Sequence, residues 1–185
     1  KPIYFSNVKI PHSINMITCG GQSSVPVIME MKKVIKDIKY VEVISSIASQ
    51  SAGKATRENI NEYIINTQRA IGQLSGLKNN KVIINLNPSK PPVNMMNSIF
   101  FECKNVIGKK IKEANVVLKN INKTIKKYIP GYNAKLFYKK SEKFFRVTIR
   151  VVGSGDYLST FAGNLDIITS SSAYIGHLLN EKNNY

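Results

Sequence analysis

The stretch Ile17-Thr18-Cys19-Gly20-Gly21-Gln22 decides the interpretation of this sequence, because it joins an apolar run to a segment with helical periodicity. A thiol at a strand-to-helix turn faces the positive end of the helix dipole, which lowers its pKa and favours the reactive thiolate. Two glycines allow a tight bend and let a substrate approach the backbone. The stretch therefore predicts a cysteine nucleophile, although the same residues also fit a small core cysteine, since free cysteines are often buried.

The bulk composition indicates one globular domain. The chain has 185 residues, of which 43% are hydrophobic, so it can bury a sizeable core. No apolar run approaches the roughly 20 residues of a membrane span. The start at Lys1 shows neither an initiator Met nor a signal peptide, so we interpret the sequence as an internal part of a protein. Cys19 and Cys103 are expected as reduced thiols in the cytoplasm, or in an organelle matrix if a targeting segment is absent here.

The net charge of +16 is large, and such a field attracts nucleic acid, anionic membranes or acidic partners. The lysines are nevertheless scattered in pairs, such as Lys32-Lys33 and Lys126-Lys127, and no cluster of arginines stands out. We therefore do not expect nucleic-acid binding as the main function. Binding of an anionic cofactor by part of this surface remains compatible with the charge.

The order of elements predicts an α+β fold with a mixed or antiparallel sheet covered by helices. Gly76 is expected to end one helix, and Pro26 fits only the first turn of another. The expected helices are 22–38, 57–77, 107–125 and 165–179. Extended segments are expected at 8–10 and 14–17, and strands at 40–47, 82–86, 99–103, 134–138 and 144–152.

The turn at Cys19 and several later stretches resemble, in the same order, the acylating acetaldehyde dehydrogenases that end the meta-cleavage pathways of aromatic degradation. Any one of these matches alone is weak, whereas five in the right order over nearly the whole chain are a strong signal. The matching stretches are Cys19-Gly20-Gly21-Gln22-Ser23-Ser24-Val25-Pro26, Ser51-Ala52-Gly53-Lys54-Ala55-Thr56-Arg57-Glu58-Asn59, 87–96, 128–132 and 157–170.

The resemblance implies oxidation of a short aldehyde, acetaldehyde, to acetyl-CoA with NAD and CoA. Cys19 would add to the aldehyde carbon, hydride transfer would leave a thioester, and the CoA thiol would take the acyl group. Backbone N–H groups of residues 20–22 are expected to stabilise the transient oxyanion. By resemblance, Ser51 to Asn59 and Asn164 contact NAD. On their own merits these residues fit a solvated turn entering a helix and the N-cap of the last helix.

The resemblance also implies an organisation. The fold should be similar to the C-terminal domain of glyceraldehyde-3-phosphate dehydrogenase, with residues 1–163 as catalytic and dimerisation domain. Residues 164–185 would form a helix packed on a Rossmann domain, of which the sequence shows no G-x-G-x-x-G fingerprint. That domain would be removed, lost or supplied by a separate chain. A homodimer and a partner aldolase of the 4-hydroxy-2-oxovalerate type are expected.

Some positions depart from the family. Asn97-Ser98 stands where the family has an acidic residue proposed as a base, and the Ser98 hydroxyl cannot accept a proton at neutral pH as a carboxylate does. Lys54-Ala55 replaces a usual Pro-Gly. His12 and His177 are isolated, and no spacing predicts a metal site. These departures and the charge leave an alternative open: a non-catalytic structural or interaction subunit of a larger assembly, one that could include nucleic acid.

Overall fold

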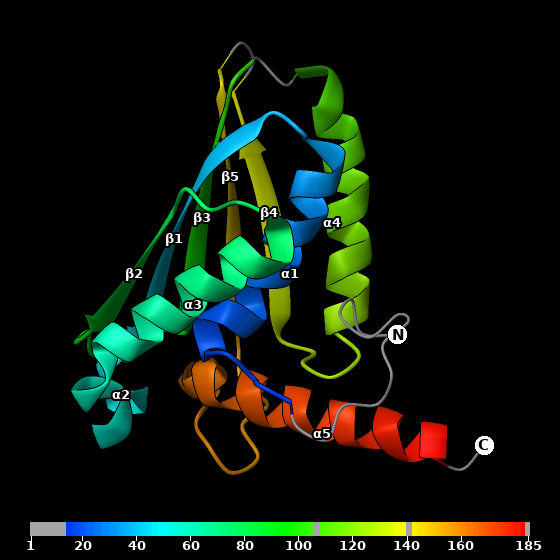
Figure 1. Ribbon diagram of the computed structural model, residues 1–185. Helices are drawn as coiled ribbons and strands as arrows, with labels where there is room; N and C mark the ends of the chain where they lie inside the picture. Colours follow the sequence, from blue (N-terminus) through cyan, green and yellow to red (C-terminus); the bar gives the residue numbers. More distant parts are fainter. Residues whose placement is uncertain (1–13, 106–107, 140–141, 184–185) are drawn as a thin grey trace.

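The computed structural model describes residues 14–105, 108–139 and 142–183, and it places a five-stranded sheet beside a layer of helices (Figure 1). The strand order is β2-β1-β3-β5-β4. The strands are β1 (Ile38–Ala48), β2 (Asn80–Asn87), β3 (Met95–Cys103), β4 (Tyr132–Tyr138) and β5 (Phe144–Val151). The α-helices are α1 (Cys19–Val34), α2 (Lys54–Glu58), α3 (Ile60–Ser75), α4 (Ile111–Ile125) and α5 (Gly163–Asn183).

The sheet is mixed, which confirms the predicted α+β class. β1 and β2 are parallel, because the chain between them crosses over through α2 and α3. The pairs β1–β3, β3–β5 and β4–β5 are antiparallel. A stacked pair of rings, Phe101 on Phe145 with centroids 4.3 Å apart, crosses the β3–β5 pairing.

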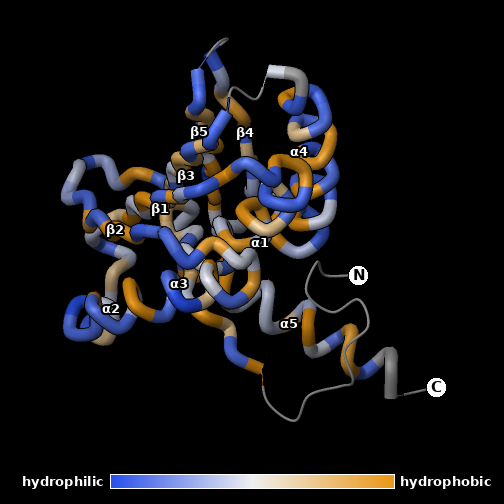
Figure 2. The backbone as a smooth tube through the Cα atoms, turned by 45° about the horizontal axis from the view of Figure 1, so that its top comes forward, coloured by the Kyte–Doolittle hydropathy of each residue, from blue (hydrophilic) through white to orange (hydrophobic). Residues whose placement is uncertain are grey.

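The core lies between the sheet and the helices α1, α3 and α4, which pack on one of its faces (Figure 1). Side chains alternate along each strand, so β3 directs Met95, Ile99 and Phe101 into this core and leaves Met96 and Phe100 on the other face. The tube in Figure 2 shows α3 and α4 with hydrophobic and hydrophilic residues in turn, as expected of helices half covered by a sheet. No helix in the described part of the chain combines the length and hydropathy of a bilayer-crossing segment.

The helix that carries Cys19 begins earlier than predicted. Thr18 is its N-cap, and the Thr18 Oγ1 accepts a hydrogen bond of 2.9 Å from the Gly21 N–H. Pro26 therefore lies inside α1 rather than in its first turn, so that expectation is wrong. Residues 14–17 form no strand, whereas the expected extended segment 8–10 lies outside the described residues.

The helix predicted over 57–77 is divided into α2 and α3 at Asn59, whose ψ of 33° departs from helical geometry. Gly76 ends α3 in the left-handed conformation with φ 75°, as predicted. The remaining predicted helices and strands are present with shifted ends, for example α4 from Ile111 rather than from residue 107, which lies outside the described residues.

The edge strand β4 is tied to α4 by a single side chain. The Asn122 Nδ2 donates to the Ala134 carbonyl oxygen at 2.9 Å, and the Ala134 N–H donates to the Asn122 Oδ1 at 2.8 Å. Ala134 is only 4% exposed, so without Asn122 these two backbone groups would be poorly hydrated. A helix side chain thus supplies the pairing that a further strand would otherwise give.

We expect the variant Asn122→Ala to lower the free energy of unfolding by about 1–3 kcal/mol, because it leaves a buried N–H and C=O without partners. Asn120→Ala is the matched control, since Asn120 is exposed on the same helix. Denaturant unfolding of both variants measures the difference. Equal midpoints for the two variants would show that the contact contributes nothing to stability.

Candidate functional site

Cys19 is the first residue of α1 and is half-buried. Its S–H donates to the hydroxyl oxygen of Tyr63 on α3, with 4.0 Å between the Sγ and Oη atoms. The preceding residue is fixed as well, because the Thr18 and Thr67 hydroxyls lie 2.7 Å apart. The thiol is therefore held at a helix start by contacts with α3, which lies 44 residues further along the chain.

The expected lowering of the Cys19 pKa is wrong for this structure. Burial raises the pKa of the Cys19 thiol, and the hydrogen bonds from Tyr63 and from the Gly20 backbone lower it only in part. The thiol is therefore predominantly protonated at neutral pH, and its reactivity must rise as the pH approaches the raised pKa.

The backbone donors proposed for an oxyanion are only partly free. The Gly21 N–H donates to Thr18 Oγ1 and the Gln22 N–H donates to the Thr18 carbonyl oxygen at 2.8 Å. The helix cap and the first i→i−4 hydrogen bond of α1 thus use two of the three N–H groups that the sequence suggested for this role. The Gly20 N–H, which lies beside the sulfur, is the one that fits the role.

Gly20 is surrounded so closely that it has no room for a side chain. A Cβ on Gly20 would overlap the Tyr63 hydroxyl and lie 2.6 Å from the Ser45 Oγ of β1. The backbone of α1 therefore approaches the sheet and α3 at this point more closely than any other residue type allows.

Asn97 on β3, not Ser98, belongs to this site. The Asn97 Nδ2 donates to the Gly20 carbonyl oxygen at 3.3 Å and to the Ser23 Oγ, and its side chain is buried on the helix-covered face. Ser98 faces the other side of the sheet. Of the pair Asn97-Ser98, it is therefore Asn97 that lies beneath the Cys19 turn. Its side chain is a neutral amide, which cannot serve as a base.

The structure brings the two segments of the predicted cofactor site together. The Asn164 Nδ2 donates to the Ser51 carbonyl oxygen at 3.1 Å, across 113 residues of sequence. Asn164 is buried one residue inside α5, so the expected N-cap role is not seen. Its Oδ1 has no hydrogen-bond partner within the described residues. The Asn164 amide oxygen is therefore a buried hydrogen-bond acceptor that a ligand beside Ser51 could use.

The loop after β1 divides into a buried and an exposed part. Ser51 and Ala52 are buried, and Arg57 braces them by donating to the Ser49 carbonyl oxygen at 2.7 Å and to the Ala52 carbonyl oxygen at 3.0 Å. A Cβ on Gly53 would meet nothing within 4 Å. The remaining predicted contact residues, Lys54, Ala55, Thr56, Glu58 and Asn59, lie on the accessible surface of α2 and its end, where Lys54 pairs with Glu58 at 3.7 Å.

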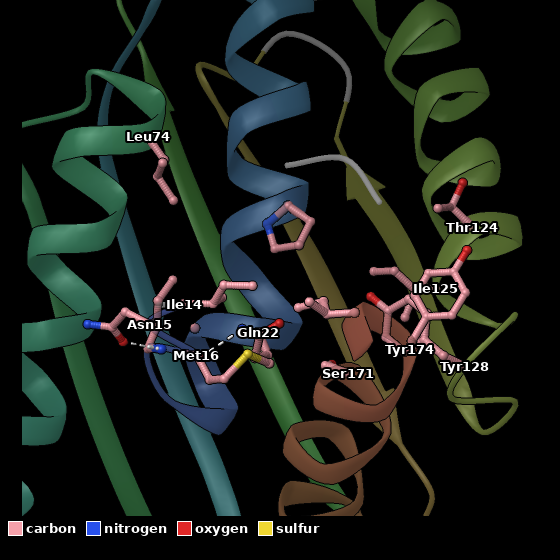
Figure 3. Close-up of a pocket in the computed structure, with 14 residues that line it drawn as sticks. Ile14, Asn15, Met16, Gln22, Leu74, Thr124, Ile125, Tyr128, Ser171 and Tyr174 are labelled. Carbon is pink, nitrogen blue, oxygen red and sulfur yellow. Dashed lines mark hydrogen bonds between the residues drawn. The ribbon is translucent and has the colours of Figure 1, made fainter. Parts of the chain in front are cut away.

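A pocket of about 200 Å³ lies on another side of the start of α1, and Cys19 does not line it (Figure 3). Tyr128, in the turn that follows α4, stacks on Tyr174 of α5 beside it, with ring centroids 4.9 Å apart. Figure 3 shows Ile14, Asn15 and Met16 on the side of α3, away from Ser171 and Tyr174. The pocket is therefore enclosed by the first and last described segments of the chain, together with residues from α1, α3 and α4.

The described residues include no group of three or more His, Cys, Asp or Glu side chains placed to hold a metal ion. His177 is exposed on α5, and His12 lies outside the described residues. Tyr63, Ser45 and Asn97 are the site residues that sequence reasoning missed. Only Asn97 left a signal, because the alternation of residues 95–103 places it with Met95 and Ile99 on the buried face.

We expect Gly20→Ala to lower the free energy of unfolding by about 1–3 kcal/mol, since the methyl group forces Tyr63 or the backbone to move. Gly53→Ala is the matched control, because its Cβ enters open space, and its effect should stay within about 0.5 kcal/mol. Thermal and denaturant unfolding measure both. The double variant Gly20→Ala/Tyr63→Phe should recover part of the loss, and no recovery would mean that the Tyr63 hydroxyl is not the obstacle.

Comparison with solved structures shows the fold alone. The chain superimposes on a probable aspartate-semialdehyde dehydrogenase from Pseudomonas aeruginosa with a TM-score of 0.53 at 9% identity. The match covers 87% of this chain and 62% of that one.

Comparison with sequences shows the family. Residues 19–159 match the family described as prokaryotic acetaldehyde dehydrogenase, dimerisation. The chain is 36% identical over 170 residues to an acetaldehyde dehydrogenase of Burkholderia thailandensis and 38% identical over 167 residues to one of Pectobacterium atrosepticum. These matches cover 92% and 90% of this chain but 56% and 55% of the relatives, so the chain spans about half of their length. The chain therefore belongs to the acetaldehyde dehydrogenase family and corresponds to its dimerisation domain.

Proposed function

We propose that this chain is the substrate-binding and dimerisation part of an acylating aldehyde dehydrogenase, which converts a short aldehyde such as acetaldehyde, with NAD and CoA, to acetyl-CoA and NADH. The observation that carries the proposal is the position of Cys19. Its thiol is half-buried at the first residue of α1, where side chains from β1, β3 and α3 converge. A glycine without room for a side chain and several buried polar groups are all required at this one turn.

The first step follows from the chemistry of the thiol. The Cys19 sulfur, after loss of its proton to solvent, forms a bond to the carbonyl carbon of the aldehyde, and the carbonyl electron pair moves onto oxygen. The Gly20 N–H and the positive end of α1 stabilise the negative charge that forms there. Because Asn97 is neutral, no carboxylate beneath the turn takes the thiol proton, so the step should depend on pH through Cys19 itself.

Asn164 and the exposed residues from Gly53 to Asn59 would hold NAD, which would supply the hydride acceptor for oxidation of the Cys19 adduct to a thioester. Two features of the structure fit its binding: the Oδ1 of buried Asn164, which has no partner in the part of the chain that the structure describes, and the open space at Gly53. Asn164 and Arg57 hold Ser51 and Ala52 in place, so the exposed residues Gly53 to Asn59 are the ones available for contact. The final step moves the acyl group from the Cys19 sulfur to the CoA thiol, which releases the Cys19 thiolate.

Homodimer formation through the uncovered face of the sheet is the second part of the proposal. Four large apolar side chains gather there: Met96, Phe100, Phe137 and Phe144, which are 43%, 38%, 47% and 55% exposed. Directly paired residues of neighbouring strands point to the same face of a sheet, and Phe100 and Phe137 are both paired with Arg146. The Arg146 guanidinium also stacks on the Phe137 ring, 4.9 Å from its centroid. An apolar face of this kind is typical of an interface.

The remaining parts of the proposal concern the rest of the protein. We place a dinucleotide-binding domain, on the same or on a separate chain, against α5 and the segment 14–17, which lie just outside the family match of 19–159. The second half of α5 supports this, because Ile175, Leu178 and Leu179 are only half-buried there. A partner aldolase and a cytoplasmic location remain predictions from the sequence.

A non-catalytic interaction subunit is the second candidate function. The neutral Asn97 beneath the turn and the raised pKa of Cys19 favour it, since both reduce the reactivity of the thiol at neutral pH. The acylation experiment below separates the two candidates, and salt-sensitive RNA binding by a chain that takes no acyl group would favour the second.

We expect Cys19, in the full chain, to take an acetyl group from acetyl-CoA by thioester exchange, with release of one CoA thiol for each acetyl group bound. Cys19→Ser should abolish this labelling, whereas Cys103→Ala should retain it, because Cys103 is 1% exposed and burial raises its pKa to about 11. Intact-mass spectrometry at increasing pH measures the adduct. The labelling rate should increase with pH, since the thiolate is the nucleophile. Equal labelling of wild type and Cys19→Ser would contradict the proposal.

We expect the charged variant Phe100→Asp to weaken the dimer by at least about tenfold in Kd, roughly 1.4 kcal/mol, because it places a carboxylate on the apolar face. Val116→Asp is the matched control, since Val116 is 59% exposed on α4, on the opposite side of the sheet. Sedimentation at several protein concentrations measures both. A dimer that resists Phe100→Asp and dissociates with Val116→Asp would place the interface elsewhere.

A further inference from the structure

Tyr63 takes no part in the steps proposed above, yet its side chain ends at a crowded point of the molecule. Tyr63 is the fourth residue of α3, and its side chain reaches across to the start of α1, where its hydroxyl accepts the Cys19 S–H at 4.0 Å. The same hydroxyl occupies the space that a Cβ of Gly20 would need. A phenylalanine would fill the apolar part of this volume, so packing alone does not explain the hydroxyl.

Ser45 supplies a second hydroxyl at the same place. It is fully buried on β1, and its Oγ would lie 2.6 Å from a Cβ on Gly20, on the side of the Tyr63 hydroxyl. The Ser45 Oγ is buried and makes no hydrogen bond of normal geometry within the described residues, although buried hydroxyls are normally paired. Burial raises the pKa of Tyr63 and a contact with Ser45 lowers it in part, so the Ser45 O–H is placed to donate to the Tyr63 Oη. Ser45 is also the cross-strand partner of Asn97, which binds the Gly20 carbonyl oxygen.

We propose that Tyr63 is a positioning residue that stabilises the thiolate of Cys19, with Ser45 orienting its hydroxyl; this inference rests on the proposed function in taking Cys19 as the nucleophile. In the thiol state the Tyr63 oxygen accepts the S–H. When the sulfur loses its proton to solvent, the Tyr63 O–H rotates and donates to the sulfur, while the Ser45 O–H donates to the Tyr63 oxygen. No proton leaves Tyr63 in this change.

The surroundings support that assignment. Burial raises the pKa of Tyr63 above its ordinary value, and a negative charge on Cys19 raises it further, so the phenol keeps its proton while the thiol titrates. Among the described residues no cation acts on the thiolate: the groups that lower the pKa of the Cys19 thiol are the Tyr63 hydroxyl and the backbone N–H groups of Gly20 and Cys19. A donated hydrogen bond to an ionised sulfur is stronger than one to a neutral group, which makes the Tyr63 contact favour ionisation.

The test is the pH profile of Cys19 alkylation by iodoacetamide in the full chain, followed by mass spectrometry of the peptide that contains Cys19. Tyr63→Phe should move the midpoint to higher pH and slow alkylation at neutral pH about three- to tenfold, the effect of losing one hydrogen bond to the thiolate. Ser45→Ala should shift the midpoint the same way by less. Tyr40→Phe is the control and should change nothing, because the Tyr40 hydroxyl donates to Glu42 on the other face of the sheet.

The profile separates this inference from a structural role and from the proposed function. At a pH that ionises the thiol fully, Tyr63→Phe should react as fast as wild type. A rate reduced by one factor at every pH, or an unchanged midpoint in both Tyr63→Phe and Ser45→Ala, would overturn the inference. Alkylation needs neither NAD nor CoA, so a shifted midpoint supports the role of Tyr63 even if Cys19 fails to take an acetyl group.

Discussion

The close approach of the Gly20 backbone to its neighbours is the contact on which the site depends. Side chains from β1, β3 and α3 all meet the first turn of α1 there, and any Cβ would push them apart. Because Thr18 both caps the helix and touches Thr67, the start of α1 is fixed in position and in direction at once. The thiol of Cys19 is thus oriented by backbone constraints, and rigidity of this kind suits the nucleophile role that we propose for it.

Local patterns predicted the elements of this fold well, and for physical reasons. The apolar periodicity of 60–74 and the glycine at 76 predicted α3 and its end, because both act within a few residues. The start of α1 was missed because Thr18, a good N-cap, precedes two glycines that are poor helix formers. The capping hydrogen bond favours a helix start at Cys19 despite their low propensity, and this early start places Pro26 in the helix interior.

The chemistry of the site was less predictable than the fold. Cys19 was found from its own turn, but burial reverses the expected direction of its pKa shift, and burial depends on chain segments far away. Tyr63 lies 44 residues from Cys19, and in the sequence it is one more apolar position of α3. Asn97 could be assigned to the buried face by strand alternation, but its contact with Gly20 follows only from how α1 crosses β3.

The edges of the sheet limit how copies of this chain can associate. Asn122 occupies the hydrogen-bonding groups of Ala134 on β4, and at the opposite edge Gln68 of α3 donates to the Asn80 carbonyl oxygen at the start of β2, at 3.2 Å. A strand from another molecule would have to displace these amides to extend the sheet. Strand-by-strand growth would thus have to break side-chain contacts at Ala134 and at Asn80, whereas the dimer interface that we propose on the apolar face leaves both sheet edges as they are.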